Sequence, residues 1–179
     1  FVVALFVLVG ICVFTIDIGR MCVARSQLQN AVDSAALAGA SQLSGYMSSG
    51  ERQAATNEAK ALASANLVLN APLNLGPDDV QFGHFDRQTG QFLDESQVSM
   101  VDSVMIRGRR TVNAPDGPVN LLFGPLCGWN HFEISTIQAV GTKPRRYVMF
   151  VLDRSGSMCF DTTGVYERYS PTWDSGEGT

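Results

Sequence analysis

The strongest hydrophobic signal in the chain is its first segment, residues 1–16, which carries no charged side chain. Drawn as a helix, this segment is apolar on every face, which is typical of a membrane span and not of a surface helix. Its helical length of about 24 Å falls short of the roughly 30 Å hydrocarbon core of a bilayer. Because the sequence opens inside the run and without a Met, we expect a fragment, cut at both ends, that starts within a transmembrane helix.

Two other interpretations of the apolar segment are open. A buried core helix is the usual interpretation of so short an apolar run. A cleaved signal peptide needs a small-residue cleavage site within a few residues, whereas Asp17, Arg20 and Arg25 come next. The nearest A-x-A pattern lies farther on, at residues 36–38. An uncleaved anchor therefore fits the pattern best.

Beyond the apolar segment, small side chains recur at helical spacing along one narrow face. Its members are Leu28, Val32, Ala35 and Gly39. The spacing predicts that the anchor continues as one long helix to about residue 43, with a face suited to close packing against another helix. A turn cluster follows at residues 44–50, and Ser48 with Glu51 forms a capping-box pattern. This pattern predicts a second helix over residues 50–69.

From residue 72 onward the pattern changes to short alternating runs, which predict strands. The expected strands are residues 79–85, 91–93, 103–112 and 132–140. Residues 86–90 are expected to form the turn between the first two strands, and residues 119–126 a short apolar turn or helix. The fold class is therefore α+β, with a long membrane-anchored helix, a second helix and a small antiparallel sheet.

A different pattern begins near residue 143. Residues 147–152 form a continuous apolar run, typical of a strand buried on both faces, and the polar tail from residue 161 predicts little order. The expected domains are the anchor and its helix at 1–45, an extracytoplasmic α+β region at 46–142, and the start of a truncated α/β domain at 143–179.

The apolar run at residues 147–152 is followed directly by Asp153, Ser155 and Ser157, on alternate positions of a Gly-containing loop. Ligands bind outside the carboxyl ends of strands in open α/β sheets, and carboxylate and hydroxyl oxygens suit Mg²⁺, Ca²⁺ or Mn²⁺. An ordinary turn after a strand is the alternative. The preceding apolar run favours a metal site.

This order of residues, VMFVLDRSGSM, resembles the first motif of the metal-ion-dependent adhesion site (MIDAS) in von Willebrand factor A (VWA) domains. The resemblance implies that Asp153, Ser155 and Ser157 help to hold a divalent cation. The family completes the site with a Thr and an Asp from two later loops, which do not follow here. Mg²⁺ or another divalent cation is therefore expected as a cofactor only if residues absent from this chain complete the site.

The first part of the chain resembles another family, the TadE/TadG-like proteins of Tad (Flp) pilus assembly. The matching features are the apolar span, Asp17-x-Gly19-Arg20, and the stretch ARSQLQNAVDSAALAGA at residues 24–40. The VQFGHFD segment and the apolar residues 119–123 also resemble TadG-type proteins, in which a VWA domain often follows the anchored module. The two resemblances stand in the order expected for that arrangement.

The TadE/TadG resemblance implies a single-pass protein of the bacterial inner membrane, with the bulk of the chain in the periplasm. Counted alone, Arg20 and Arg25 behind the span weakly favour the opposite orientation. The implied function is a structural or assembly component of a Tad pilus system, with metal-dependent adhesion in the full-length protein. It would act by protein–protein contact with other pilus-assembly proteins, through a packing surface on the Ala-rich helix. A membrane-anchored VWA adhesin or binding module unrelated to pili is the alternative.

Composition and charge narrow the function classes further. A net charge of −4, a pI near 5.1 and the lack of long Lys/Arg runs argue against a nucleic-acid partner. No G-x-S-x-G or phosphate-loop pattern appears, and no base or oxyanion element can be assigned to Ser155 or Ser157 as a nucleophile. We therefore expect neither an enzyme nor a small-molecule substrate.

Acidic residues of the long helix have two interpretations each. Asp17, at the edge of the span, could pair with an amine of a partner subunit. The favoured alternative is an interfacial carboxylate with Arg20 as its i+3 neighbour. Asp33 could lie on a solvated face or act as a polar register marker, and the sequence does not decide between them.

Other chemically capable residues have ordinary structural interpretations. His84 and His131 are isolated in the sequence, and each is expected to pack in the fold or to lie on the surface. The arginines of the strand at residues 103–112 are expected on a solvated face; they are Arg107, Arg109 and Arg110. Cys127 and Cys159 could pair in an oxidising periplasm, and a buried free thiol is the alternative.

Overall fold

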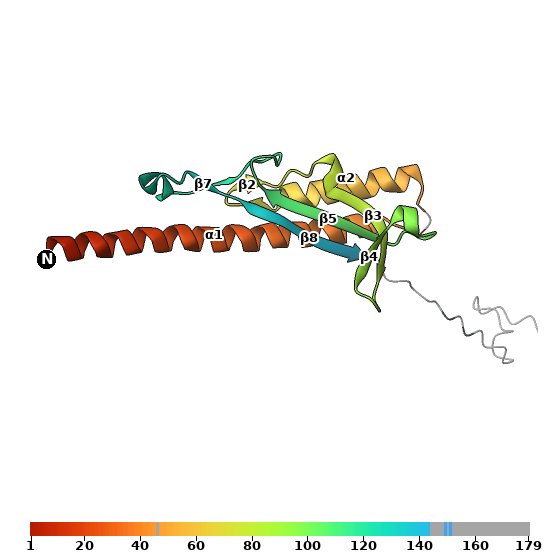
Figure 1. The fold of residues 1–179 in the computed structure, drawn as a ribbon. Helices are drawn as coiled ribbons and strands as arrows, with labels where there is room; N and C mark the ends of the chain where they lie inside the picture. The colour runs from red at the N-terminus through yellow and green to blue at the C-terminus, as the bar shows by residue number, and fades with distance from the viewer. Residues whose placement is uncertain (46, 144–148, 150, 152–179) are drawn as a thin grey trace, which may run out of the picture. The chain divides into compact units, whose positions relative to one another are not determined.

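The computed structural model describes residues 1–45, 47–143, 149 and 151 of the chain. The contact pattern divides the chain into two units, Phe1–Pro144 and Arg145–Thr179. The first unit has the predicted α+β architecture, with a long N-terminal helix, a second helix and antiparallel sheets (Figure 1). The strand expected at residues 147–152 falls mostly outside the described residues, and the VWA-type domain stays a prediction.

The first helix, α1 (Val2–Ser41), is continuous, as the sequence predicts. Residues 1–16 include no buried side chain, because the rest of the fold packs only on later turns. An 18-residue window of α1 is apolar enough to cross a membrane, and 6% of that window is buried. Among the described residues, α1 is the one helix that meets these criteria. It is therefore a candidate membrane anchor.

The later turns of α1 pack through the predicted small-residue face. Leu28, Val32 and Ala35 are each 0% exposed, and Gly39 is buried beside them. The second helix, α2 (Ser49–Ala65), covers part of this face. A Cβ on Gly39 would lie 3.4 Å from the carbonyl oxygen of Ala55 in α2, which is ordinary contact distance. The predicted packing of the face against another helix is confirmed within the chain.

The capping box predicted at the start of α2 is present. Ser48 Oγ accepts a hydrogen bond from the Glu51 backbone N–H at 3.2 Å. The Glu51 carboxylate in turn accepts from the Ser48 backbone N–H at 3.0 Å. The box satisfies two amide groups that the first helical turn leaves without an intrahelical acceptor.

The predicted end of α2 at residue 69 is wrong, because the helix ends at Ala65. A small hairpin follows, in which β1 (Leu67–Val68) pairs with β2 (Ala71–Pro72). Its turn residues, Leu69 and Asn70, have φ values of 49° and 69°. Positive φ at both central residues is the geometry of a two-residue hairpin turn, and Asn tolerates it well.

The main sheet has four strands in the order β4-β3-β5-β8, and every neighbouring pair is antiparallel. The strands are β3 (Val80–Asp86), β4 (Gln91–Asp94), β5 (Ser103–Arg110) and β8 (Ile134–Thr142). Their positions lie close to those predicted. The expected strand at 132–140 is divided, because Phe132 belongs to a separate hairpin and β8 begins two residues later.

That separate hairpin joins β6 (Val119–Asn120) to β7 (His131–Phe132). The 3₁₀ helix η3 (Gly124–Cys127) lies within its loop. The segment expected as a turn or helix, residues 119–126, is therefore the short strand β6 followed by a 3₁₀ turn. Two further 3₁₀ turns, η1 (Pro77–Asp79) and η2 (Glu95–Gln97), lie at the ends of sheet strands.

One face of the main sheet packs directly on α1. On β5 this face contains Val104, Ile106 and Gly108, which the sequence places on one side. A Cβ on Gly108 would lie 2.2 Å from Val32 Cγ2. On β8, a Cβ on Gly141 would lie 2.0 Å from the carbonyl oxygen of Ala36. Glycine at both positions therefore lets the sheet approach the helix closely.

This packing corrects one expectation about α1. The small-residue face was expected to offer a contact surface to partner proteins. In the structure α2, β5 and β8 cover that face within the chain itself. This face is therefore not open to a partner protein.

Candidate functional site

One candidate residue that is built firmly into the fold is Asp17, at the end of the uncharged segment of α1. Asp17 is only 4% exposed, although most of the apolar residues before it are exposed. Asp17 Oδ1 accepts a hydrogen bond from the Leu122 backbone N–H at 2.9 Å. Asp17 Oδ2 accepts from the Phe123 backbone N–H at 3.1 Å. The carboxylate therefore binds consecutive amides of the β6–β7 loop.

Arg20, one turn later on α1, binds the same loop. Its Nε donates to the carbonyl oxygen of Asn120 at 3.2 Å. Two charged side chains of α1 thus bind this segment. Asp17 accepts hydrogen bonds from its backbone amides, and Arg20 donates one to a backbone carbonyl. We call the contact between Asp17, Arg20 and residues 120–123 the anchor–loop junction.

The expected pairing of Asp17 with Arg20 is therefore wrong, while the interfacial position of Asp17 stays a prediction. Within the described residues, Asp17 and Arg20 form no ion pair with each other, and each binds the loop instead. The partner lies more than one hundred residues away in the chain, at a separation of 105 for the bond to Leu122. No local pattern reveals such a contact. Asp33, by contrast, is exposed and accepts a bond from Gln29 Nε2 at 2.8 Å, which is the solvated-face alternative.

A cluster at one end of the sheet unites residues that the sequence left apart. His84 Nδ1 lies 2.9 Å from Asp102 Oδ1, so His84 is not isolated. Ser103 Oγ donates to the same carboxylate oxygen at 2.9 Å and also bonds Thr142 Oγ1 at 3.1 Å. Ser103 is 0% exposed. Because Ser103 bonds the carboxylate and not the imidazole, the cluster lacks the Ser–His contact that a nucleophilic relay requires.

The arginines of β5 were expected on a solvated face. The structure differs, because their side chains have partners within the fold or are buried. Arg107 Nη2 donates to Gln81 Oε1 at 3.1 Å, and Arg109 Nη2 lies 3.2 Å from Asp79 Oδ1. Arg110 is only 7% exposed, and strand alternation places it on the same side of β5 as the buried Ile106 and Gly108. A bulge shifts the register of β5 against β8 between Gly108 and Arg110. The strand was correctly predicted, but the bulge and the acidic partners were not visible in the local pattern.

An open cavity of about 370 Å³ lies beside these arginines. Its lining residues are Asp78, Asp79, Arg107, Arg109, Thr136 and Gln138. Strand alternation places Arg107 and Gln138 on the sheet face opposite to Ile106 and Ala139, and therefore away from α1. The lining carries charges of both signs. This outer sheet face is a polar surface that the described residues leave open.

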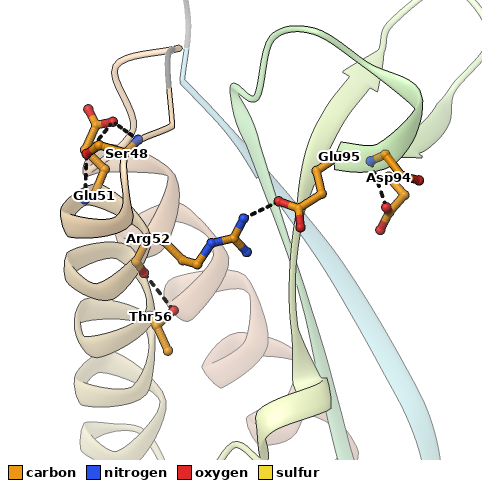
Figure 2. A network of polar contacts seen from close by, with 7 residues as sticks. Ser48, Glu51, Arg52, Thr56, Asp94 and Glu95 are labelled. Atoms are coloured by element: carbon orange, nitrogen blue, oxygen red, sulfur yellow. Dashed lines mark hydrogen bonds and ion pairs between the residues drawn. The ribbon is translucent and has the colours of Figure 1, made fainter.

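A second set of polar contacts ties α2 to the sheet. Arg52 of α2 forms an ion pair with Glu95 of η2 (Figure 2). The Arg52 guanidinium also lies 4.9 Å from the ring centroid of Phe82, within cation–π range. Asp94 caps η2 by accepting from the Ser96 backbone N–H at 3.0 Å, and this backbone hydrogen bond lowers the pKa of Asp94. The network orders the start of α2 over the sheet.

The metal-ligating residues expected from the sequence lie outside the described residues. They are Asp153, Ser155 and Ser157. Within the described part of the chain, no group of three His, Cys, Asp or Glu side chains is placed to hold a metal ion. Cys127 is exposed, so the buried-thiol alternative is wrong for it, while Cys159 falls outside the described residues.

One comparison with known proteins matches the N-terminal helix. A family model described as Flp pilus-assembly TadE/G-like (Tad) matches residues 1–42. The matched segment coincides with α1, which ends at Ser41. The TadE/G-like resemblance is therefore confirmed for α1. No curated protein and no solved structure matches the chain.

Proposed function

We propose that the protein is a membrane-anchored structural or assembly component of a Tad (Flp) type pilus system. It would work by tethering and by protein–protein contact, from the bacterial inner membrane with the bulk of the chain in the periplasm. The observation that carries the proposal is the TadE/G-like family match over residues 1–42, which coincides with the one candidate membrane span among the described residues.

The packing of α1 supports a tethering role. The exposed apolar turns and the buried core turns belong to one uninterrupted helix. A flexible linker would let a tethered domain rotate freely, whereas a continuous helix transmits a fixed orientation. The anchor–loop junction adds a second connection between α1 and the rest of the fold.

The outer sheet face is the surface we assign to partner proteins. The small-residue face of α1 and the inner sheet face are already covered within the chain. Arg107 and Arg109 lie at the outer face and are partly exposed, with 35% of the Arg109 side chain open. A partner that offers carboxylate or carbonyl acceptors would bind the exposed part of these guanidinium groups.

A complementation experiment tests the proposal. In the bacterium that encodes this chain, the gene is deleted and pili are counted by electron microscopy. The wild-type gene should restore the pili that the deletion removes. Leu8→Arg should not, because a central Arg raises the free energy of membrane insertion by about 2.5–3.5 kcal/mol. Leu67→Arg is the matched control, since Leu67 is similarly exposed, at 50% against 59%, but lies outside the candidate span.

Unchanged pili in the deletion strain would refute the pilus role. Loss of pili with both arginine variants would point to misfolding and not to lost anchorage. Membrane fractionation of the same strains separates these outcomes, because it reports anchorage without depending on pili.

Metal-dependent adhesion by the full-length protein is a further part of the proposal. It rests on the sequence pattern at Asp153, Ser155 and Ser157 after an apolar run. Titration of the full-length protein with Mg²⁺ tests it, and Asp153→Ala should abolish the binding. If Mg²⁺ binds but the deletion leaves pili intact, the alternative of a VWA adhesin unrelated to pili is favoured.

A further inference from the structure

The loop between β6 and β7 combines high exposure with an apolar composition. Three of its large apolar side chains are among the most open of the fold, Leu122 at 56%, Leu126 at 81% and Trp129 at 69%. From Gly117 to Phe132 the chain contains no Asp, Glu, Lys or Arg. A water-facing loop ordinarily carries polar residues at such positions. We call residues 121–130 the apolar tip.

The apolar tip is held in a defined shape. Across its base, the Leu121 backbone N–H donates to the Asn130 carbonyl oxygen at 3.1 Å. Within the tip, the Trp129 backbone N–H donates to the Gly124 carbonyl oxygen at 3.0 Å. Gly128 has a φ of 83°, which favours glycine. Trp129 and Leu126 are therefore exposed on an ordered turn.

The anchor–loop junction fixes the tip beside a particular level of α1. The Asp17 carboxylate and the Arg20 guanidinium hold residues 120–123 at the first charged turn after the uncharged residues 1–16. In Figure 1 the β6–β7 loop lies alongside α1, toward its N-terminal end. If residues 1–16 lie in hydrocarbon, this turn of the helix lies at the bilayer surface.

From this placement we propose that the apolar tip inserts into the interfacial layer of the membrane that holds α1. The occupant of the exposed apolar surface is lipid, because the tip is held at the end of the uncharged segment of α1 and itself carries no charge. Trp is enriched at the headgroup level of bilayers, where its apolar ring and its N–H group are both satisfied. The proposal rests on the anchoring part of the proposed function and adds a second membrane contact to it.

Fluorescence of Trp129 in lipid vesicles tests the proposal. The chain contains two Trp residues, so Trp173→Phe leaves Trp129 as the single reporter. The purified 179-residue chain with this change is reconstituted into phosphatidylcholine–phosphatidylglycerol vesicles and floated on a density gradient. We expect blue-shifted emission, a loss of emission when the acyl chains are brominated near the headgroup, and little quenching by aqueous acrylamide.

A matched control places the reporter away from the membrane. Leu37 is 64% exposed on the same helix, twenty residues beyond Asp17 and therefore about 30 Å from it. With Leu37→Trp, Trp129→Phe and Trp173→Phe combined, we expect acrylamide quenching and no effect of brominated lipid. This control shows that quenching in the test variant reports the tip and not general adsorption.

Each contrary result has a separate meaning. A protein that floats with vesicles but leaves Trp129 open to acrylamide and insensitive to brominated lipid overturns the tip proposal while the anchor stands. A protein that does not float overturns the anchoring part of the proposed function and the tip proposal together. A second variant, Leu126→Asp, guards against an indirect effect. It should reduce brominated-lipid quenching of Trp129 without changing flotation, and unchanged quenching would count against insertion.

Discussion

At the scale of single residues, Asp17 joins two segments that lie far apart in the sequence. Its carboxylate is the acceptor for the amides of Leu122 and Phe123. Asp17→Ala should lower the free energy of unfolding by about 1–3 kcal/mol, because it leaves those amides without an acceptor. Urea unfolding in detergent micelles measures the loss, and hydrogen exchange at the two amides should accelerate.

The matched control for Asp17 is Asp33 on the same helix. Asp33 is exposed and bonds only a neighbouring glutamine side chain among the contacts described. Asp33→Ala should change the free energy of unfolding by no more than about 0.5 kcal/mol. Equal losses for the two variants, or unchanged exchange at Leu122 and Phe123, would contradict the junction.

Gly141 carries a second prediction at the residue scale. A Cβ there would lie 2.0 Å from the Ala36 carbonyl oxygen and 2.8 Å from the Leu37 nitrogen, and both are backbone atoms. Since backbone cannot rotate aside, Gly141→Ala should destabilise the fold by about 1–3 kcal/mol. Gly50→Ala is the comparison, because its Cβ would contact only Ser48 Oγ at 3.9 Å. Thermal unfolding should show a lower midpoint for Gly141→Ala alone.

At the scale of elements, the capping box makes the stability contributed by the start of α2 depend on pH. Hydrogen bonds, first from the Ser44 side chain and then from the Ser48 backbone, lower the pKa of Glu51 below its ordinary value of 4.5. A carboxyl group with a lowered folded-state pKa stabilises the fold above its unfolded-state pKa. That contribution is lost as pH falls through the folded-state pKa.

Glu51→Gln should therefore remove a pH-dependent part of the stability. We expect the variant to be less stable than the wild type at neutral pH, and the two curves of unfolding free energy against pH to converge below about pH 4. Urea unfolding across that range provides the curves. A constant difference at all pH values would assign the effect to geometry and not to the charge of Glu51.

The elements also show which features a sequence pattern reveals. The small-residue face of α1, the capping box and the alternation of β5 are local regularities, and the structure confirms each. The hairpin at Leu67–Pro72 was missed, because its turn depends on positive φ at Leu69 as well as Asn70, and Leu gives no turn signal. The bulge between β5 and β8 was missed because it depends on how the two strands pair.

The candidate site was less predictable than the elements. Asp17 was identified as worth attention, but its acceptor role depends on residues 122–123, which only the folded chain brings near. His84 and Asp102 likewise meet across neighbouring segments. Such contacts are set by tertiary packing, and no spacing within the sequence encodes them. Metal binding by Asp153, Ser155 and Ser157 stays a prediction from the sequence motif.

At the scale of the whole molecule, the family match and the folding unit have different boundaries. The match covers residues 1–42, which is α1 with little beyond it. The buried face of that helix, from Ala24 to Ala40, belongs to the same hydrophobic core as Ile106 and Val104 of the sheet. Helix α1 therefore shares its core with the α+β region, although the family match covers α1 with little beyond it.

This difference predicts opposite outcomes for two shortened chains. A chain that lacks residues 1–14 keeps Asp17 and the whole buried face of α1, so it should unfold cooperatively in water. A chain that lacks residues 1–42 loses that face and leaves the inner surfaces of α2 and the sheet uncovered. It should show no cooperative transition and should bind a hydrophobic dye, because no other described element covers those surfaces. Circular dichroism during heating distinguishes the two. Cooperative unfolding of the shorter chain would mean that the α+β region folds alone and that α1 contributes only anchorage.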